Sequence, residues 1–308
     1  MGQETAAQKV QIGAGTVIRP SPGKGVARRA MAWSGRYPLL PGLILLVMTV
    51  CGVLAPWIAP HDPIRPNYAA IAQPPAWSAD GTSQFLLGTD HLGRDMLTRL
   101  VYGARVSLMV VLISTTSGML IGTILGLVAG YFGGNVDEII SRIVDIWLAI
   151  PFLLVAMIIV IVLGQSFPLM LLLLALLAWS PFVRNVRAEV LSLRERDYVA
   201  SAKISGAASA RILLKHMLPN VTNTIMVIAT LRVGQLILAE SILSFLGVGV
   251  PPPTPAWGSM VADGRNYLNT AWWISSLPGV AILLVVMAFN FTGDWVRDRT
   301  DPRLRQLG

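Results

Sequence analysis

The sequence predicts an all-α polytopic membrane protein with six transmembrane helices. Its 308 residues are 54% hydrophobic and only 13% charged, whereas a soluble domain has about 25% charged residues. Uncharged stretches long enough to cross a bilayer recur along the chain. The excess of basic residues, formally +8, suits loops on the cytoplasmic side of a membrane better than a nucleic-acid surface.

Six apolar stretches define the expected spans. The second has no charge between Arg105 and Asp137, and the sequence GQSFP at 164–168 divides a longer uncharged run into the third and fourth. We expect the spans at about 39–59, 106–131, 140–163, 168–186, 222–247 and 273–294.

Lysine and arginine residues are distributed unevenly between the two sides that six spans define. Seventeen lie in the N-terminal tail, between spans four and five, or after span six, and five lie in the other connections. Cytoplasmic loops carry the basic excess, so both termini and the segment between spans four and five are expected in the cytoplasm. The expected divisions are a cytoplasmic tail at 1–37, a first span with an extracytoplasmic segment at 38–104, a core of five spans at 105–297 that includes a cytoplasmic loop at 187–220, and a cytoplasmic tail at 298–308.

The segments on the opposite side are rich in proline. Residues 60–75 are expected to have extended backbone at the surface, and residues 247–258 are expected to form another proline-rich crossing on the outer side. Asp90 is expected to cap a helix that runs into span two. Four tryptophans suit the outer interfacial belt: Trp57, Trp257, Trp272 and Trp273.

Span two has a glycine at every fourth position. These residues are Gly118, Gly122, Gly126 and Gly130. This spacing puts them on one helical face, where another backbone can approach closely. We expect the face to pack against another span or subunit; the alternative, that glycine is simply frequent in membrane helices, does not explain the register.

The segment at 194–220 is polar and helix-forming, unlike the apolar sequence on either side. Asp197 is expected to cap a short helix, YVASAKIS, and Gly206 suits the position after its end, where φ is often positive. A second helix is expected at about 208–218, ending before Pro219. The alternatives are a helix lying on anionic lipid, a DNA-binding helix-turn-helix, which tethering to the bilayer at both ends disfavours, and a solvated loop, which leaves the apolar stripe of the second helix unexplained.

This segment resembles the cytoplasmic EAA loop of ABC importer permeases, whose pattern is E-A-A-x3-G-x9-I-x-L-P. The matching residues are Ala200, Ser201 and Ala202 at the EAA positions, Gly206 at the glycine, His216 at the isoleucine, and Leu218 and Pro219 at the end. The leading glutamate is absent, so a charge-specific role at that position is not carried over.

Further stretches resemble the dipeptide, oligopeptide and nickel branch of that family. They are LLGTDHLGRDMLTRLVYGARVSL (86–108), RIVDIWLAIP (142–151), ILAESILSFLGVGVPPPTPAWGSM (237–260) and FNFTGDWVRDRTDPRLR (289–305). The resemblance covers nearly all of 39–305. It implies the type I importer permease fold and the second, C-type permease of a peptide importer in the bacterial inner membrane, with nickel, opines or glutathione-like solutes as alternatives.

The resemblance also implies partners and a coupling site. The expected partners are a homologous second permease, two ABC ATPase subunits or domains, an extracytoplasmic solute-binding protein and membrane lipid, with no nucleic acid. In the family the loop docks in a cleft of the ATPase. The residues expected at this joint are Asp197, Tyr198, Ala200, Ser201, Ala202, Gly206, His216 and Pro219. The chain has no G-x4-G-K-[ST] phosphate loop. We therefore expect that it binds no cofactor and that the partner ATPase subunits bind ATP and Mg.

Charged residues within spans are candidates for function. Arg142 and Asp145 are three residues apart and are expected to pair near the cytoplasmic end of span three. Arg232 and Glu240 lie about 12 Å apart along span five, too far to pair directly. The hypothesis is that either faces the translocation path, a gate or the partner permease; the alternative is that each binds a polar group within the chain.

Other classes of function fit the sequence less well. A membrane enzyme would require H-E-x-x-H, G-x-S-x-G or paired intramembrane aspartates, so we expect a non-catalytic subunit. A self-sufficient channel or secondary transporter leaves the docking-like loop unexplained. No metal site is expected, because the outer His and Asp residues match no compact ligand spacing: His61, Asp62, Asp90, His91 and Asp95.

Overall fold

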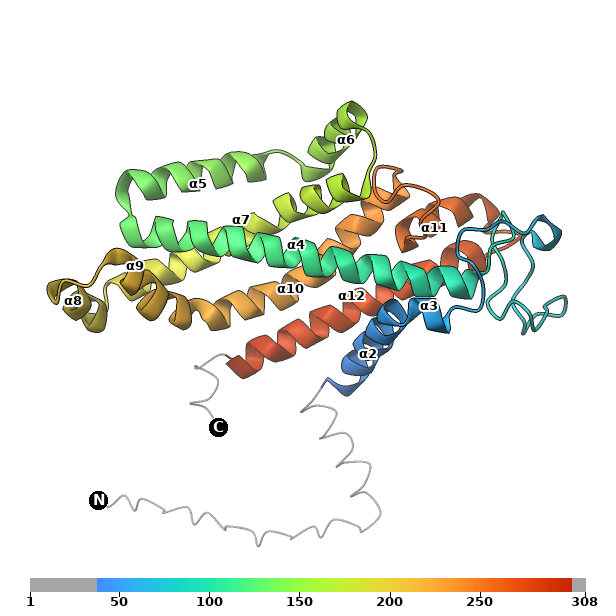
Figure 1. The fold of residues 1–308 in the computed structure, drawn as a ribbon, viewed down its shortest axis with the longest axis horizontal. Helices are drawn as coiled ribbons and strands as arrows, with labels where there is room; N and C mark the ends of the chain where they lie inside the picture. Colours follow the sequence, from blue (N-terminus) through green and yellow to red (C-terminus); the bar gives the residue numbers. More distant parts are fainter. Residues whose placement is uncertain (1–37, 301–308) are drawn as a thin grey trace, which may run out of the picture. The chain divides into compact units, whose positions relative to one another are not determined.

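The computed structural model describes residues 38–300, and these form helices and connecting segments with one isolated β-bridge. The elements are α2 (Leu39–Val53), α3 (Ala55–Ile58), η1 (Tyr68–Ala70), α4 (Met96–Phe132), α5 (Gly134–Ala149), α6 (Phe152–Leu163), α7 (Phe167–Arg194), α8 (Asp197–Ile204), α9 (Ser209–Ile212), η2 (Leu213–Met217), α10 (Leu218–Phe245), α11 (Trp257–Gly264), η3 (Arg265–Tyr267) and α12 (Trp273–Thr300) (Figure 1). The predicted all-α class is confirmed. The tail expected at 1–37 and most of the one expected at 298–308 lie outside the described residues.

Within residues 38–300, four helical stretches are long and apolar enough to cross a membrane. They are α4, α7, the continuous stretch Ser209–Phe245 and α12. Helices α5 and α6 meet the same criterion only together, and α2 is a shorter apolar helix of 15 residues. The six expected spans therefore correspond to four long helices, one broken pair and one short helix.

The broken pair interrupts the span predicted at 140–163. Helices α5 and α6 are bent by 81°. A proline ring pushes the preceding residue out of the helical region, and Ile150, before Pro151, has φ −94° and ψ 126°. The first helix ends at Ala149 for this reason, and the second starts at Phe152.

Helices α4 and α7 run parallel and make the most extensive helix–helix contact in the described chain. The structure places the four regularly spaced glycines of α4, Gly118, Gly122, Gly126 and Gly130, against α7. A Cβ added to Gly126 would lie 2.8 Å from Cβ of Val186, and one added to Gly130 would lie 2.7 Å from Cβ of Val190. Side chains at these positions would clash, so glycine is what allows the two backbones to approach.

The segment before α4 is organised by two buried aspartates. Asp95, not Asp90, caps the helix, because its Oδ2 accepts a 3.0 Å hydrogen bond from the Thr98 amide. Asp90 lies before the turn at Gly93, which has φ 75°, and it accepts from the Arg94 amide at 2.9 Å and from Arg94 Nε at 2.6 Å. The expectation that Asp90 caps the helix was therefore wrong, because the capping residue lies five positions later.

Two of the tryptophans expected at the outer interface are buried instead. Trp257 and Trp273 are 3% and 6% exposed, and each indole N–H donates a 3.0 Å hydrogen bond to a backbone carbonyl. Because each indole N–H already has a hydrogen-bond partner inside the protein, these tryptophans do not have to lie at the membrane–water interface. The other two, Trp57 and Trp272, are exposed.

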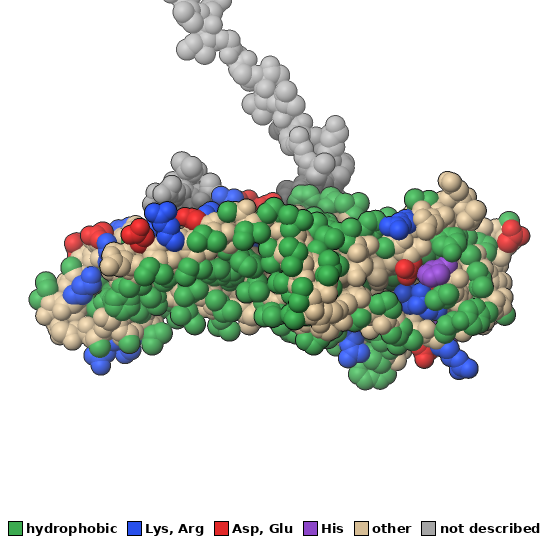
Figure 2. Space-filling model, turned by 90° about the horizontal axis from the view of Figure 1, so that it is seen from above, with side chains coloured by type: hydrophobic (Ala, Val, Ile, Leu, Met, Phe, Trp, Pro, Cys, Tyr) green, Lys and Arg blue, Asp and Glu red, His purple; other side chains and the backbone are tan. Residues whose placement is uncertain are grey.

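Polar segments lie at both ends of the long helices. Helices α8 and α9 lie at one end, and the segment 59–95 lies at the other (Figure 1). Figure 2 shows hydrophobic side chains over the middle of one face, with charged side chains gathered toward the two ends. This distribution suits a chain whose middle is surrounded by the apolar part of a bilayer.

Candidate functional site

The segment between α7 and α10 begins with α8, which starts at Asp197. The N-cap position is Arg196, and no side chain caps this helix. Asp197 therefore does not act as the expected cap. It is the first helical residue instead, where a negative charge favours the helix N-terminus.

Gly206 ends α8 as predicted, with φ 75°. The Ala207 amide donates to the Ala202 carbonyl and the Gly206 amide to the Lys203 carbonyl, both at 3.0 Å. These two bonds define a Schellman motif, whose left-handed residue is most often glycine. The turn between α8 and α9 is therefore fixed by backbone hydrogen bonds.

The second helix of the segment does not end before Pro219. Residues Leu213–Met217 form a turn of π-helix, Pro219 lies in the first turn of α10, and the helical stretch continues to Phe245. In a regular α-helix a proline ring clashes with the carbonyl four residues earlier. The π turn, with its wider i→i+5 bonding, accommodates the ring, so the predicted stop at Pro219 was wrong.

The three residues at the EAA positions do not share one surface. Ala200 and Ser201 are exposed, whereas Ala202 is half-buried against an apolar cluster. Ile204 lies on the same face as Ala200 and Ser201, and it is 87% exposed. Sequence reasoning missed Ile204, although its spacing of four and three residues from that small pair predicts a shared face.

Tyr198 and His216 come together from different parts of the segment. Their ring centroids are 6.1 Å apart, with Tyr198 in α8 and His216 in the π turn. Tyr198 is 41% exposed. The structure therefore gathers most of the residues expected at the ATPase joint at one end of the long helices (Figure 1).

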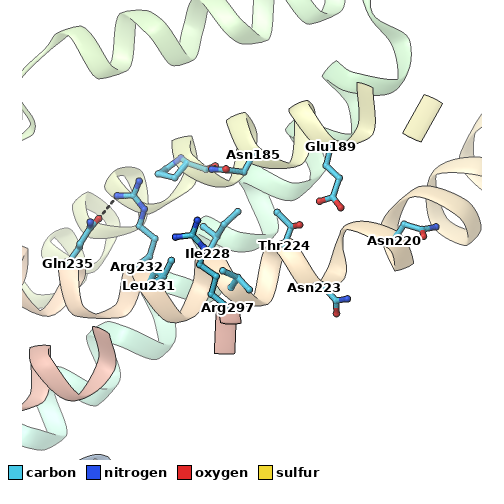
Figure 3. Close-up of a pocket in the computed structure, with 12 residues that line it drawn as sticks. Asn185, Glu189, Asn220, Asn223, Thr224, Ile228, Leu231, Arg232, Gln235 and Arg297 are labelled. Carbon is cyan, nitrogen blue, oxygen red and sulfur yellow. Dashed lines mark hydrogen bonds between the residues drawn. The ribbon is translucent and has the colours of Figure 1, made fainter. Parts of the chain in front are cut away.

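An open groove of about 770 Å³ lies between α7 and α10 (Figure 3). Its lining residues are Pro181, Asn185, Glu189, Asn220, Asn223, Thr224, Val227, Ile228, Leu231, Arg232, Gln235 and Arg297. Those from α10 recur every three or four residues, so they occupy one helical face. Amide and charged side chains on one face of a membrane helix favour contact with water or a polar solute over lipid.

Arg232 and Glu240 lie in different environments. Arg232 is half-buried in the groove, where its Nη1 donates to Oε1 of Gln235 at 2.5 Å (Figure 3). Glu240 is 0% exposed, does not line the groove, and accepts a 2.7 Å hydrogen bond from Oγ of Ser244. One charge therefore faces the groove, and the other is enclosed among helices.

Arg142 and Asp145 do not pair with each other. Arg142 lies 3.6 Å from Glu138 of its own helix, whereas Asp145 accepts a 2.7 Å hydrogen bond from Arg184 of α7. The expected pair is wrong because a tertiary partner on α7 is better placed for Asp145 than its neighbour in sequence.

The outer His and Asp residues are not arranged like the ligands of a metal site. Among the described residues, no group of three or more His, Cys, Asp or Glu side chains is placed to bind a metal ion. His61 Nδ1 instead lies 3.3 Å from Oδ2 of Asp95.

Comparisons with known proteins agree with the helical architecture. Residues 122–306 match the family described as binding-protein-dependent transport system inner membrane component. The chain is 43% identical to the di/tripeptide transport system permease protein DppC of Pseudomonas aeruginosa, covering 85% of this chain and 87% of the relative. It is 44% identical to the dipeptide transport system permease protein DppC of Escherichia coli, covering 86% of this chain and 89% of the relative.

A solved structure has the same fold. It is an inward facing conformation of the MetNI methionine ABC transporter, with a TM-score of 0.52 and 22% identity, covering 67% of this chain and 98% of that chain. The fold is therefore the type I ABC importer permease fold that the sequence predicted. With this fold, the match over residues 122–306 and relatives above 40% identity, the chain belongs to the family of inner membrane components of binding-protein-dependent transport systems.

Proposed function

We propose that this chain is a permease subunit of an ATP-driven importer of di- and tripeptides. The observation that carries the proposal is the 43% identity, over 85% of the chain, to a permease whose name specifies di/tripeptide transport. The subunit is non-catalytic: ATP and Mg bind to two ABC ATPase partners, and a homologous second permease completes the pathway. An extracytoplasmic binding protein delivers the peptide.

The loop around α8 is the proposed joint to the ATPase. Small side chains at Ala200 and Ser201 allow a partner surface to approach closely, and the exposed Ile204 offers an apolar contact. The Schellman motif at Gly206 fixes the angle between α8 and α9. A rigid joint of this kind passes movement of the ATPase into the membrane helices.

The groove between α7 and α10 is proposed as this subunit's half of the translocation path. It is lined mainly by amide and charged side chains, including Arg232. A peptide needs polar partners to replace water as it crosses the apolar layer. The second permease closes the open side of the groove.

Reconstitution tests the importer proposal. The chain is purified with a homologous permease, ATPases and a binding protein of the same transport system, placed in liposomes, and supplied with ATP inside. We expect ATP-dependent uptake of a radiolabelled dipeptide that unlabelled tripeptide inhibits and nickel does not. Uptake of nickel alone, or equal peptide uptake without the ATPases, would contradict the proposal.

Gly206→Asp tests the joint. At φ 75° a residue with a side chain is strained by roughly 1–2 kcal/mol, and the added carboxylate changes the docking surface. We expect the variant to reach the membrane at normal levels but to lose co-purification with the ATPases. Gly247→Asp is the matched control, because Gly247 has φ 77°, has no atom within 4 Å of an added Cβ, and ends α10 with the same pair of backbone hydrogen bonds at another site. Equal loss of ATPase in both variants would contradict a specific joint.

A further inference from the structure

Tyr131, near the end of α4, contacts both helical parts of the loop between α7 and α10. The centroid of its ring lies 5.3 Å from Nζ of Lys203 in α8. Its hydroxyl lies 3.5 Å from Oγ of Ser209, the first residue of α9. These two partners lie on opposite sides of Gly206 in the sequence. One side chain of a transmembrane helix therefore bridges the two parts of the loop.

Tyr131 is held by a closely packed apolar cluster. It is 9% exposed, and the cluster includes Val199 of α8, Ile212 of α9 and Met217 of the π turn, each 0% exposed. Close-packed interiors transmit displacement, because few voids exist into which a side chain can move. A displacement of α8 or α9 is therefore passed to the ring of Tyr131.

The backbone beside Tyr131 is fixed to α7. A Cβ on Gly130 would lie 2.7 Å from Cβ of Val190 and 3.0 Å from the Arg187 carbonyl oxygen, so α4 and α7 are in close contact at this level. Movement of Tyr131 is then carried by both helices, because they are packed together along the glycine face.

We propose that Tyr131 is a positioning residue for coupling, which passes displacement of the loop to the α4–α7 pair. The inference rests on the proposed importer function. The alternative is that Tyr131 only fills space in the apolar cluster. That alternative predicts a loss of stability without a change in the peptide transported per ATP hydrolysed.

The test compares two variants of Tyr131 in the complete reconstituted transporter. Tyr131→Phe keeps the ring over Lys203, whereas Tyr131→Leu removes it. We expect dipeptide uptake per ATP hydrolysed to fall at least about fivefold in Tyr131→Leu, the lower end of ordinary coupling between sites. In Tyr131→Phe it stays close to the wild-type value, because a 3.5 Å hydrogen bond is at the long limit and contributes little.

Lys203→Met tests the other side of the contact at an exposed residue, so it remains informative if Tyr131→Leu does not assemble. It keeps the apolar stem and removes the charge. Uptake per ATP is expected to fall at least about twofold, the effect of losing a weak cation–π contact. The double variant with Tyr131→Leu is expected to lose no more than Tyr131→Leu alone, because residues in contact are not additive.

Phe132→Leu is the matched control. Phe132 follows Tyr131 on α4, is 54% exposed, and contacts the Tyr131 ring edge-on at 5.1 Å. We expect its uptake per ATP to match wild type. The amount of assembled transporter and its melting temperature are measured for every variant, which separates loss of folding from loss of coupling.

The outcomes separate this inference from the proposed function. Wild-type uptake per ATP in Tyr131→Leu or Lys203→Met, or an equal loss in Phe132→Leu, overturns the role of Tyr131 and leaves the importer intact. Absence of ATP-dependent peptide uptake by the wild-type complex overturns the proposed function itself.

Discussion

Two charged side chains of α10 are surrounded so differently that we expect different roles for them. Arg232 is half-buried and lines the groove, while Glu240 is 0% exposed and bound to Ser244. A guanidinium in an open groove can contact a passing solute. An enclosed carboxyl group cannot do so unless the helices separate. We therefore expect Arg232 to affect transport and Glu240 to affect stability.

Arg232→Ala is expected to lower peptide uptake about tenfold, which corresponds to about 1.4 kcal/mol. The reason is the loss of a positive charge that Gln235 holds in the groove. Assembly with the partners should not change. Uptake assays and co-purification measure the two effects, and Arg232→Lys, which keeps the charge, should retain part of the uptake. Normal uptake in Arg232→Ala would remove Arg232 from the path.

Glu240→Ala is expected to destabilise the subunit by about 1–3 kcal/mol, because the buried Ser244 hydroxyl loses its acceptor. Glu240→Gln keeps an oxygen at the same place and should be close to wild type in stability. Thermal unfolding of the purified complex measures both. Equal melting temperatures for Glu240→Ala and wild type would show that this hydrogen bond contributes nothing.

At the scale of elements, the glycine face of α4 gives a matched pair of substitutions. A Cβ on Gly122 would lie 2.5 Å from Cβ of Phe182 in α7, so Gly122→Ala should overpack the contact at a cost of about 1–3 kcal/mol. Gly279 of α12 has no atom within 4 Å of such a Cβ, so Gly279→Ala should be neutral or slightly stabilising. Melting temperatures in detergent compare the two. A similar change in both variants would contradict close packing at Gly122.

The sequence predicted where the apolar helices lie better than where those helices bend or end. Apolar length located all six segments, because hydrophobicity is averaged over a span and tolerates local irregularity. The same averaging concealed the bend at Pro151. At Pro219 the sequence predicted an interruption that the structure does not have. The rule that proline ends a helix does not allow for a π turn that accommodates the ring.

The contacts between side chains in the candidate site were the hardest feature to predict from the sequence. The turn at Gly206 followed from the sequence because it depends on one residue's own φ. The partner of Asp145 did not, because Arg184 lies on another helix and local spacing cannot reveal it. Ile204 was overlooked for a different reason: a single apolar residue in a polar segment is conspicuous only once its exposure is known.

At the scale of the whole molecule, the distribution of basic residues predicts which end faces the cytoplasm. Cys51 is the one cysteine of the chain, so Cys51→Ser provides a background for labelling. Ser201→Cys, in α8, should react with a membrane-impermeant maleimide only in inside-out vesicles, which are prepared without the ATPases because the proposed joint would cover this residue. Ser78→Cys, in the exposed segment at the other end, should react only in right-side-out vesicles. The reverse pattern would contradict the orientation.

The stretch Ser209–Phe245 is helical throughout, and it contains both the second part of the loop and the groove-lining face of α10. Arg232 lies 23 residues beyond Ser209, about 35 Å along the axis. No flexible connection separates them. A rotation of the loop about this axis would change which side chains of α10 face the groove, so in the proposed importer the polarity of the path depends on the position of the joint.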